Sequence, residues 1–337
     1  MEINTVSQSD FVKLATVIWQ KSYDSVPQYM LNSGLVQKVN IPAMTGNTRE
    51  FSSVDVNEYL SYKGESDQAA RGQVQQGYSA TMTAYRVAEN LGISYEMVTQ
   101  GKYPEVVKRL TGAGKQGPNR IDLDLSHRFT FGTATSYTDK DGRTIDVTTG
   151  ASTSQQLFDT NHPLKGSTTT YRNRLANNPR LSKGTIEGMR RLVVEETYNA
   201  LGEKMTADFD ILWTTDDPNT VNTAKEYLKS TASPEAANAG VINVNLNRYR
   251  HVILPRVATD CNGAPDSTKR YYWGIASSSM SSFYCGIWET PHLIPPVVGG
   301  NGEDAQTDDR DYRNRAGYGI AVVEGMWVKF SSGDGTA

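Results

Sequence analysis

The chain has 337 residues, which is enough for one large domain or two smaller ones with a sizeable buried core. Its 34 Lys and Arg nearly balance its 37 Asp and Glu, and the formal net charge of -3 excludes the strong positive field of a dedicated nucleic-acid binder. Hydrophobic residues make up only 37%, while 18 Tyr and 29 Gly are present, so we expect much polar, extended surface that neighbouring molecules stabilise.

Cysteine content and hydropathy limit where the protein works. Cys261 and Cys285 are too few for a disulfide framework and lack the paired spacing of a zinc site, which favours a reducing compartment. No stretch reaches the roughly 18 consecutive apolar residues that span a membrane. The start, Met1 to Asn4, lacks the basic and apolar regions of a signal peptide. We therefore expect a cytoplasmic protein without a membrane partner.

The N-terminal segment predicts a helix followed by an arm. Apolar residues recur at helical spacing over residues 11–23, and Ser9 or Asp10 is available as an N-cap. Pro27 and Pro42 then interrupt regular structure. The apolar stripe needs a partner, which is either its own domain or a neighbouring molecule.

A long hairpin is expected next. The pattern predicts strands over residues 48–56 and 73–90, joined by a polar tip over residues 61–67. Both strands carry small or polar residues on both faces, and a two-stranded hairpin without an apolar face is marginal in water. The hairpin must therefore lie on another surface, with an ordinary surface hairpin as the alternative.

The middle of the chain predicts helical segments and a turn. Apolar residues from Tyr95 to Phe131 indicate helices, and the Gly112–Pro118 run predicts a break between them. Asp139–Gly142 predicts a turn that joins two short strands.

Two further helices have clear start signals. Ser182 can cap a helix with an inner stripe that reaches Ala200 and a stop at Gly202. Pro218, directly after Asp217, predicts the first position of another helix. The strands expected here cover residues 209–213, 250–254, 271–275 and 284–288, and the last three would form the sheet of an α+β domain.

The C-terminal part combines a charged loop with a last strand. An acidic loop is expected over residues 299–311. Met326, Val328 and Phe330 lie on one face of the expected final strand, which would return to the domain that precedes the α+β domain and close it. Charges of both signs alternate over residues 308–315. This alternation favours pairing across a subunit seam, and a solvated face is the alternative.

Two loops resemble ligand motifs only in part. Gly112–Lys115 fails as a phosphate loop, because Arg109 stands where glycine is required and Gln116 where Ser or Thr is required. Asp139–Gly142 begins like a calcium loop, but Gly150 occupies the position of the bidentate carboxylate. We therefore expect no nucleotide site at the first, and the second is better explained as a tight turn.

No other candidate chemistry is convincing. The Ser277–Ser282 run lacks the Gly-x-Ser-x-Gly elbow of a nucleophile, and no carboxylate pair can be assigned acid and base roles. The four histidines lack metal spacing; they are His127, His162, His251 and His292. We therefore expect no catalytic residue, no metal and no cofactor, and a protein that is not an enzyme.

Three runs are left that no catalytic chemistry explains: Gln156–Leu164, Asn173–Leu175 and Asp311–Ile320. The first is an apolar pair that ends in a turn, since Asn161 can bond its own backbone and Pro163 fixes φ. In this order the runs resemble the major capsid proteins of tailed bacteriophages, in particular the Mu-like head subunits. There, Leu-Phe-x-Thr-x-His-Pro-Leu precedes a helix and Arg-x-Arg-x-Gly precedes the last strand. The resemblance spans most of the chain.

The resemblance implies the α+β fold named for phage Hong Kong ninety-seven. In this chain it would give an N-terminal arm over residues 1–45, an E-loop hairpin over 46–92, a peripheral domain that begins with 93–205, an axial domain over 206–298, and a peripheral return strand over 299–337. The E-loop would reach over the adjacent subunit. A long spine helix would lie in the peripheral domain.

The function implied is that of a major capsid protein. It would self-assemble into hexamers and pentamers of an icosahedral shell that encloses double-stranded DNA, after an initial procapsid. Its partners would be copies of itself, with scaffolding, portal and decoration proteins in addition, and packaged DNA would be contacted without sequence preference. Its location would be the virion, after assembly in the host cytoplasm.

Expected inter-subunit contacts fall into two groups. The hairpin tip supplies Tyr62, Lys63, Glu65 and Asp67, and the entry to the final strand supplies Arg310, Arg313 and Arg315. Two other function classes stay open. One is another phage structural protein, such as a tail or connector component. The other is a carbohydrate-binding or hydrolytic surface protein, because Tyr and Trp are frequent and Ser and Thr loops are long.

Overall fold

The computed structural model describes residues 8–40, 48–94, 96–97, 100, 102–152, 154–232, 241–296 and 310–335, which form a mixed helix and sheet fold. The helices are α1 (Gln8–Asp24), α3 (Tyr103–Thr130), α4 (Lys183–Glu195), α5 (Pro218–Lys229) and the short 3-10 helix η2 (Pro255–Ala258). The strands are β1 (Gln37–Asn40), β2 (Thr48–Val56), β3 (Val74–Ile93), β4 (Ser136–Thr138), β5 (Thr144–Asp146), β6 (His162–Leu164), β7 (Ser167–Tyr171), β8 (Ile211–Thr214), β9 (Arg250–Ile253), β10 (Trp273–Ala276), β11 (Phe283–Ile294), β12 (Arg310–Val322) and β13 (Val328–Ser331).

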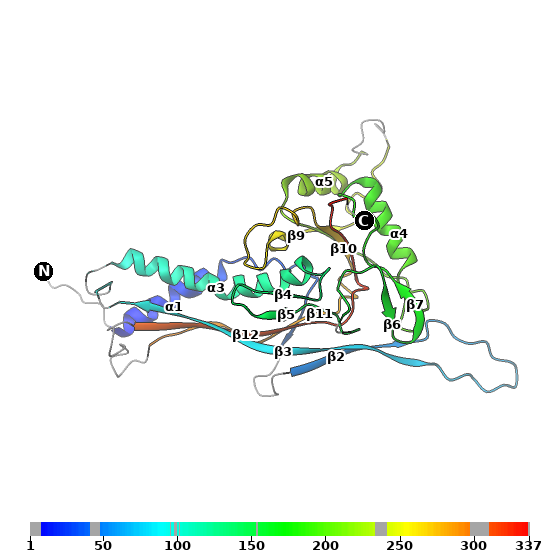
Figure 1. Ribbon diagram of the computed structural model, residues 1–337, viewed down its shortest axis with the longest axis horizontal. Helices are drawn as coiled ribbons and strands as arrows, with labels where there is room; N and C mark the ends of the chain where they lie inside the picture. The colour runs from blue at the N-terminus through cyan, green and yellow to red at the C-terminus, as the bar shows by residue number, and fades with distance from the viewer. Residues whose placement is uncertain are drawn as a thin grey trace.

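The longest strands form a five-stranded sheet in the order β1-β11-β12-β3-β2, along the base of the molecule in Figure 1. β1 is parallel to β11, and the other neighbours are antiparallel. β12 pairs with β3 from Arg310↔Ile93 to Gly319↔Ala84. The Asp311–Ile320 run therefore lies inside β12, and the expectation that it is an entry to the last strand is wrong.

A second sheet has four strands in the order β13-β10-β8-β9 and lies in the upper part of Figure 1 with α4 and α5. Two expectations fail here. Residues 284–288 were expected in this sheet but belong to β11, which pairs with β1 and β12. The final strand was expected to close the first domain, but β13 pairs with β10. An apolar pattern identifies a strand without naming its neighbour. The division into peripheral and axial domains stays a prediction.

α3 is one continuous helix, so the expected break at residues 112–118 is wrong. Pro118 lies inside it, and the glycines before the proline serve close packing. A Cβ added to Gly114 would lie 2.5 Å from the backbone oxygen of Trp19, and one added to Gly117 would lie 2.8 Å from Cβ of Pro291. The glycines thus let α1 and β11 approach α3, and this packing outweighs the cost of a proline inside the helix.

The helix termini confirm two of the predicted start signals, while one start signal and one stop signal fail. Ser182 forms a capping box with Thr185 at the start of α4. Asp217 accepts a hydrogen bond from the Thr220 backbone nitrogen at 3.0 Å, with Pro218 opening α5. α4 ends at Glu195, so the predicted stop at Gly202 is wrong. α1 already includes Ser9 and Asp10, so neither can be its N-cap.

Several local expectations are confirmed. The Asp139–Gly142 turn joins β4 and β5, and Gly142 has φ 78°. The apolar stripe of α1 packs within its own chain, since Phe11, Ala15 and Trp19 share a buried cluster with Leu110 of α3. This contact decides between the two partners that the sequence left open.

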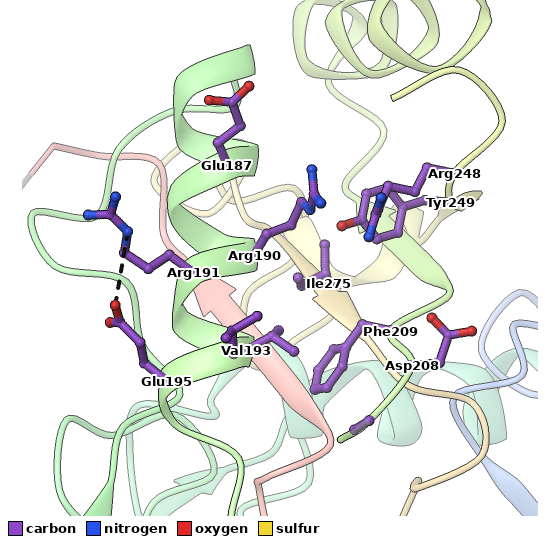
Figure 2. Close-up of a pocket in the computed structure, with 12 residues that line it drawn as sticks. Glu187, Arg190, Arg191, Val193, Glu195, Asp208, Phe209, Arg248, Tyr249 and Ile275 are labelled. Atoms are coloured by element: carbon purple, nitrogen blue, oxygen red, sulfur yellow. Dashed lines mark ion pairs between the residues drawn. The ribbon is translucent and has the colours of Figure 1, made fainter. Parts of the chain in front are cut away.

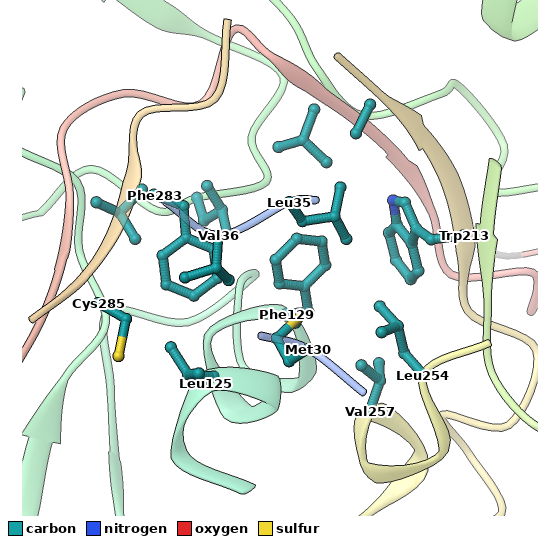
Figure 3. Packing of buried hydrophobic residues seen from close by; sticks show 14 of the residues in the cluster. Met30, Leu35, Val36, Leu125, Phe129, Trp213, Leu254, Val257, Phe283 and Cys285 are labelled. Carbon is teal, nitrogen blue, oxygen red and sulfur yellow. The ribbon is translucent and has the colours of Figure 1, made fainter. Parts of the chain in front are cut away.

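Aromatic residues from distant parts of the chain fill the main core, shown in Figure 3. Phe129 of α3 is fully buried and meets Trp213 of β8 edge to face, with ring centroids 5.0 Å apart. Phe158, from the Leu-Phe pair of the first sequence run, stacks on Phe330 of β13 at 4.1 Å. The core thereby joins α3 to the four-stranded sheet. No helix in the described part of the chain has the length and hydropathy to cross a bilayer.

Candidate subunit interface

The β2–β3 hairpin extends beyond the body of the molecule at the right of Figure 1. Its ladder runs from Thr48↔Thr83 to Val56↔Val74, and a last backbone bond joins the Asn57 nitrogen to the Gln73 oxygen at 3.3 Å. Residues 58–72 form a loop outside the ladder. The structure confirms the predicted hairpin and makes its second strand longer than expected.

Polar contacts fasten the base of the hairpin to the body. Asp55 Oδ2 accepts a hydrogen bond from the Ala200 backbone nitrogen at 2.7 Å. The Glu58 backbone nitrogen donates to Glu203 Oε2 at 2.7 Å, and Lys165 Nζ donates to the Gly77 carbonyl at 3.0 Å. Hydrogen bonds of this kind each contribute about 1 kcal/mol. They hold the base while leaving the tip uncovered.

Apolar side chains are exposed along this hairpin. Val54 and Val56 share one face of β2, and Val74 is the register partner of Val56. Their exposed fractions are 61%, 59% and 69%. In the loop, Leu60 is 100% exposed and Tyr62 is 107% exposed. A projecting arm with this much uncovered apolar surface is typical of an interaction site.

The other predicted tip residues are also exposed. Lys63, Glu65 and Asp67 lie in the loop, and none of them forms an ion pair within 4.0 Å with any described residue. The Asp67 backbone nitrogen donates to the Gly64 carbonyl at 3.3 Å, which closes a local turn. All four tip residues are therefore accessible to another molecule, and their interface role stays a prediction.

The predicted arginine group is divided by the structure. Arg315 Nε donates to Glu289 Oε1 at 2.6 Å, so this arginine has a partner in its own chain. Arg313 is exposed, and its Nε donates to Asn90 Oδ1 at 3.1 Å. Arg310 is the first residue of β12. Pairing across a seam stays a prediction, and Asp308 and Asp309 lie outside the described residues.

Glu289 of β11 lies close to two arginines and a histidine. Besides Arg315, it meets Arg86 Nε at 3.5 Å and His292 Nε2 at 3.6 Å. The Arg86 guanidinium also lies over the Trp288 ring, 4.9 Å from its centroid. The arginines of the last sequence run thus contribute to the five-stranded sheet itself, a role that the sequence did not reveal.

A mixed-charge groove lies between α4 and the segments that precede β8 and β9, as Figure 2 shows. Its volume is ≈ 380 Å³, and Phe209 and Ile275 are among its apolar lining residues. Arg190 and Arg248 come from opposite sides, and the Arg248 guanidinium lies 5.9 Å from the Tyr249 ring centroid. Charged side chains of a second protein would find partners here. The sequence does not reveal this groove, because its sides come from separate segments of the chain.

Two ionisable groups, the buried Lys329 and the partly buried Glu324, were not identified from the sequence. Lys329 of β13 donates to the carbonyl oxygens of Glu196 at 2.9 Å and Arg172 at 3.4 Å, and burial lowers its pKa to about 7. Burial, together with the Asp55 carboxylate, raises the pKa of Glu324 to about 7. Neither residue has a sequence signal, because burial depends on the assembled fold.

Both cysteines are free, and burial raises the pKa of the Cys285 thiol to about 12. Across the described ranges, no group of His, Cys, Asp or Glu has the arrangement of a metal site.

No family model matches the chain, and no curated protein sequence matches it. Among solved structures, a chain from Gordonia phage Cozz is 12% identical, with a TM-score of 0.48, and the match covers 91% of this chain and 89% of that chain. A chain from Mycobacterium phage Cain is 11% identical, with a TM-score of 0.47 and coverage of 97% and 96%. A chain of a virus-like particle from Pyrococcus furiosus is 8% identical, with a TM-score of 0.45 and coverage of 96% and 99%.

Proposed function

We propose that the chain is a major capsid subunit of the tailed-phage type. Copies of it assemble into hexamers and pentamers of an icosahedral shell around double-stranded DNA, by way of a procapsid. The protein works through assembly and is not an enzyme. It resides in the virion after assembly in the host cytoplasm.

The observation that carries this proposal is the projecting hairpin. Its base is fastened by polar contacts, while Leu60 and Tyr62 at its tip and the valine face of its strands are uncovered by the described residues. Covering apolar surface contributes about 25 cal/mol per Å². A second copy is the occupant that we propose, because each subunit then offers both an arm and a body to its neighbours, as a closed lattice requires.

The sequence runs support the same function. The Gln156–Leu164 run carries the resemblance to phage head subunits, and in the fold its Leu157 and Phe158 are core residues. α3 is continuous, as the resemblance implies for a spine helix and contrary to the break that its glycines and proline suggested.

The charge balance fits a container for DNA. A net charge of -3 provides a weakly acidic wall that does not trap a packed polyanion, so contact with DNA would be weak and without sequence preference. Scaffolding, portal and decoration proteins are the further partners that this function requires or admits.

Sedimentation velocity of the purified full chain tests the proposal. We expect heavy particles or capsomers from the native chain and a shift toward small species from the double variant Leu60→Ser, Tyr62→Ser. Tyr103→Ser, which alters an exposed tyrosine at the start of α3, is the matched control and should assemble normally. A native chain that stays small and binds a polysaccharide array would contradict the proposal and favour the carbohydrate-binding alternative.

A further inference from the structure

A polar pocket lies where two neighbouring strands of the long sheet separate. β12 pairs with β3 as far as Gly319↔Ala84, and beyond this point the loop before β6 enters between them. The Gly150 backbone nitrogen donates to the carbonyl oxygens of Val322 at 3.1 Å and Val323 at 2.9 Å. The resulting pocket has a volume of ≈ 470 Å³ and is lined by residues of β3, β12 and this loop, and by Arg128 of α3.

Arg128 is a buried cation that forms no ion pair with any described residue, and the Asp146 and Asp124 carboxylates attract it only from beyond ion-pair distance. Arg128 is 7% exposed, and its Nη1 donates a hydrogen bond to the backbone oxygen of Asp146. Within the described residues, no carboxylate oxygen lies within 4.0 Å of its guanidinium nitrogens. The Asp146 carboxylate is engaged elsewhere, since its Oδ1 accepts from the Thr148 nitrogen at 2.8 Å and from Thr148 Oγ1 at 2.6 Å.

Arg120, eight positions earlier on the same helix, is an arginine whose charge is balanced by carboxylates of the same chain. It forms ion pairs with Asp124 at 3.1 Å, Asp139 at 3.0 Å and Asp141 at 3.5 Å. An uncompensated buried charge costs several kcal/mol. Burial accordingly lowers the pKa of Arg128, and a nearby anion would relieve this cost.

A second buried group in the same pocket also lacks a partner. Thr149 is 5% exposed, and its Oγ1 has no hydrogen-bond partner among the described residues. The lining further includes the hydroxyl-bearing residues Ser79, Thr81 and Thr83. A guanidinium and hydroxyl donors in one pocket are the groups that bind carboxylates and phosphates.

We propose that this pocket binds a small oxyanion, a carboxylate or a phosphate group, with the Arg128 guanidinium as its charge partner and the Thr149 hydroxyl as a hydrogen-bond donor. The anion comes either from solution or from an acidic side chain of a second copy. The site itself does not depend on self-assembly.

Isothermal titration calorimetry of the dissociated full chain with inorganic phosphate, and separately with acetate, tests the site. Chloride at matched ionic strength is the control anion. We expect saturable binding of at least one of the two anions. Arg128→Lys, which keeps the charge but loses the guanidinium fork, should weaken it at least about tenfold. Thr149→Val should weaken it about three- to tenfold and covers the case in which an Arg128 variant fails to fold. Arg191→Ala, an exposed arginine on α4, is the control and should bind normally.

The source of the anion follows from repeating the titration on assembled particles. Binding to both forms identifies a free anion, and binding to the dissociated chain alone identifies a carboxylate supplied by a neighbouring copy. A chain that binds the anion through Arg128 but never assembles would support the site while contradicting the proposed function. Absence of saturable binding, or unchanged affinity in both the Arg128→Lys and Thr149→Val variants, would overturn the inference.

Discussion

His162 and Asn173 meet in one buried hydrogen bond, with Nε2 of the histidine 3.1 Å from Oδ1 of the asparagine. The Asn173 amide nitrogen donates to the carbonyl oxygens of Leu157 at 2.6 Å and Gly325 at 2.9 Å. Its Oδ1 also accepts from the Asp159 backbone nitrogen at 2.9 Å. One side chain therefore joins two of the sequence runs to the turn before β13. Burial lowers the pKa of His162 to about 4, so the ring is neutral at neutral pH.

Replacing Asn173 should destabilise the subunit. Asn173→Ala removes the side-chain partner of the Leu157 carbonyl and of the Asp159 backbone nitrogen, and it leaves the Gly325 carbonyl with only its 3.4 Å bond from the Val328 nitrogen. We expect a loss of about 2–4 kcal/mol in the free energy of unfolding. Urea denaturation measures it. Asn222→Ala, at an exposed position of α5, is the control, with an expected change within about 0.5 kcal/mol. Equal stability of the two variants would show that the buried network contributes little.

Glu324 should make stability depend on pH. Its pKa in the folded protein is about 7, above the ordinary 4.5. The contribution of Glu324 to the free energy of unfolding is therefore fully present below pH 4.5, and it is lost as the pH rises to about 7. Glu324→Gln stays neutral. We expect it to be more stable than the native chain by up to about 3 kcal/mol at pH 8 and nearly equal at pH 4.5.

Denaturation at the two pH values measures this difference, with the exposed Glu187→Gln as control. Because Asp55 at the hairpin base contributes to the raised pKa, Asp55→Asn should lower the pKa of Glu324. A Glu324→Gln difference that is the same at both pH values would contradict the assignment.

Shortening the hairpin should separate folding from assembly. Deletion of residues 59–71 joins Glu58 to Gly72 and leaves a two-residue loop between the paired Asn57 and Gln73. The deleted loop is exposed throughout, so we expect circular dichroism and thermal unfolding to change little while closed particles are lost. Normal particles from the shortened chain would show that the tip is dispensable.

The two arginines of β12 should act differently. Arg315→Ala breaks a partly buried ion pair with Glu289, and we expect a loss of about 1–3 kcal/mol in subunit stability. Arg313→Ala removes an exposed guanidinium, so the subunit should keep its stability while assembly becomes weaker and more salt-sensitive. Thermal unfolding and light scattering at two salt concentrations distinguish these effects. Assembly that is unchanged in Arg313→Ala would contradict its place at a seam.

Features encoded by local contacts were predictable from the sequence. The hairpin strands, the Ser182 and Asp217 caps and the Asp139–Gly142 turn depend on residues close together in the chain, and the structure has all of them. The exposed tip residues were also identified, because a polar loop between two strands has no core to enter.

Features set by distant contacts were not predictable. The glycines of α3 indicated a break because the sequence does not show that Trp19 and Pro291 pack against them. Residues 284–288 were assigned to the wrong sheet because partner choice depends on the whole fold. The partner of Arg315, the groove beside α4 and the burial of Arg128 likewise arise only when separate segments meet.

Electron cryo-microscopy of the purified full chain tests the central claim most directly. The account predicts closed icosahedral shells in which Leu60 and Tyr62 of each subunit are covered by a neighbouring copy. Rings or tubes would instead indicate a connector or tail component. Dispersed single subunits with an uncovered hairpin, even at high protein concentration, would contradict a role as a shell protein.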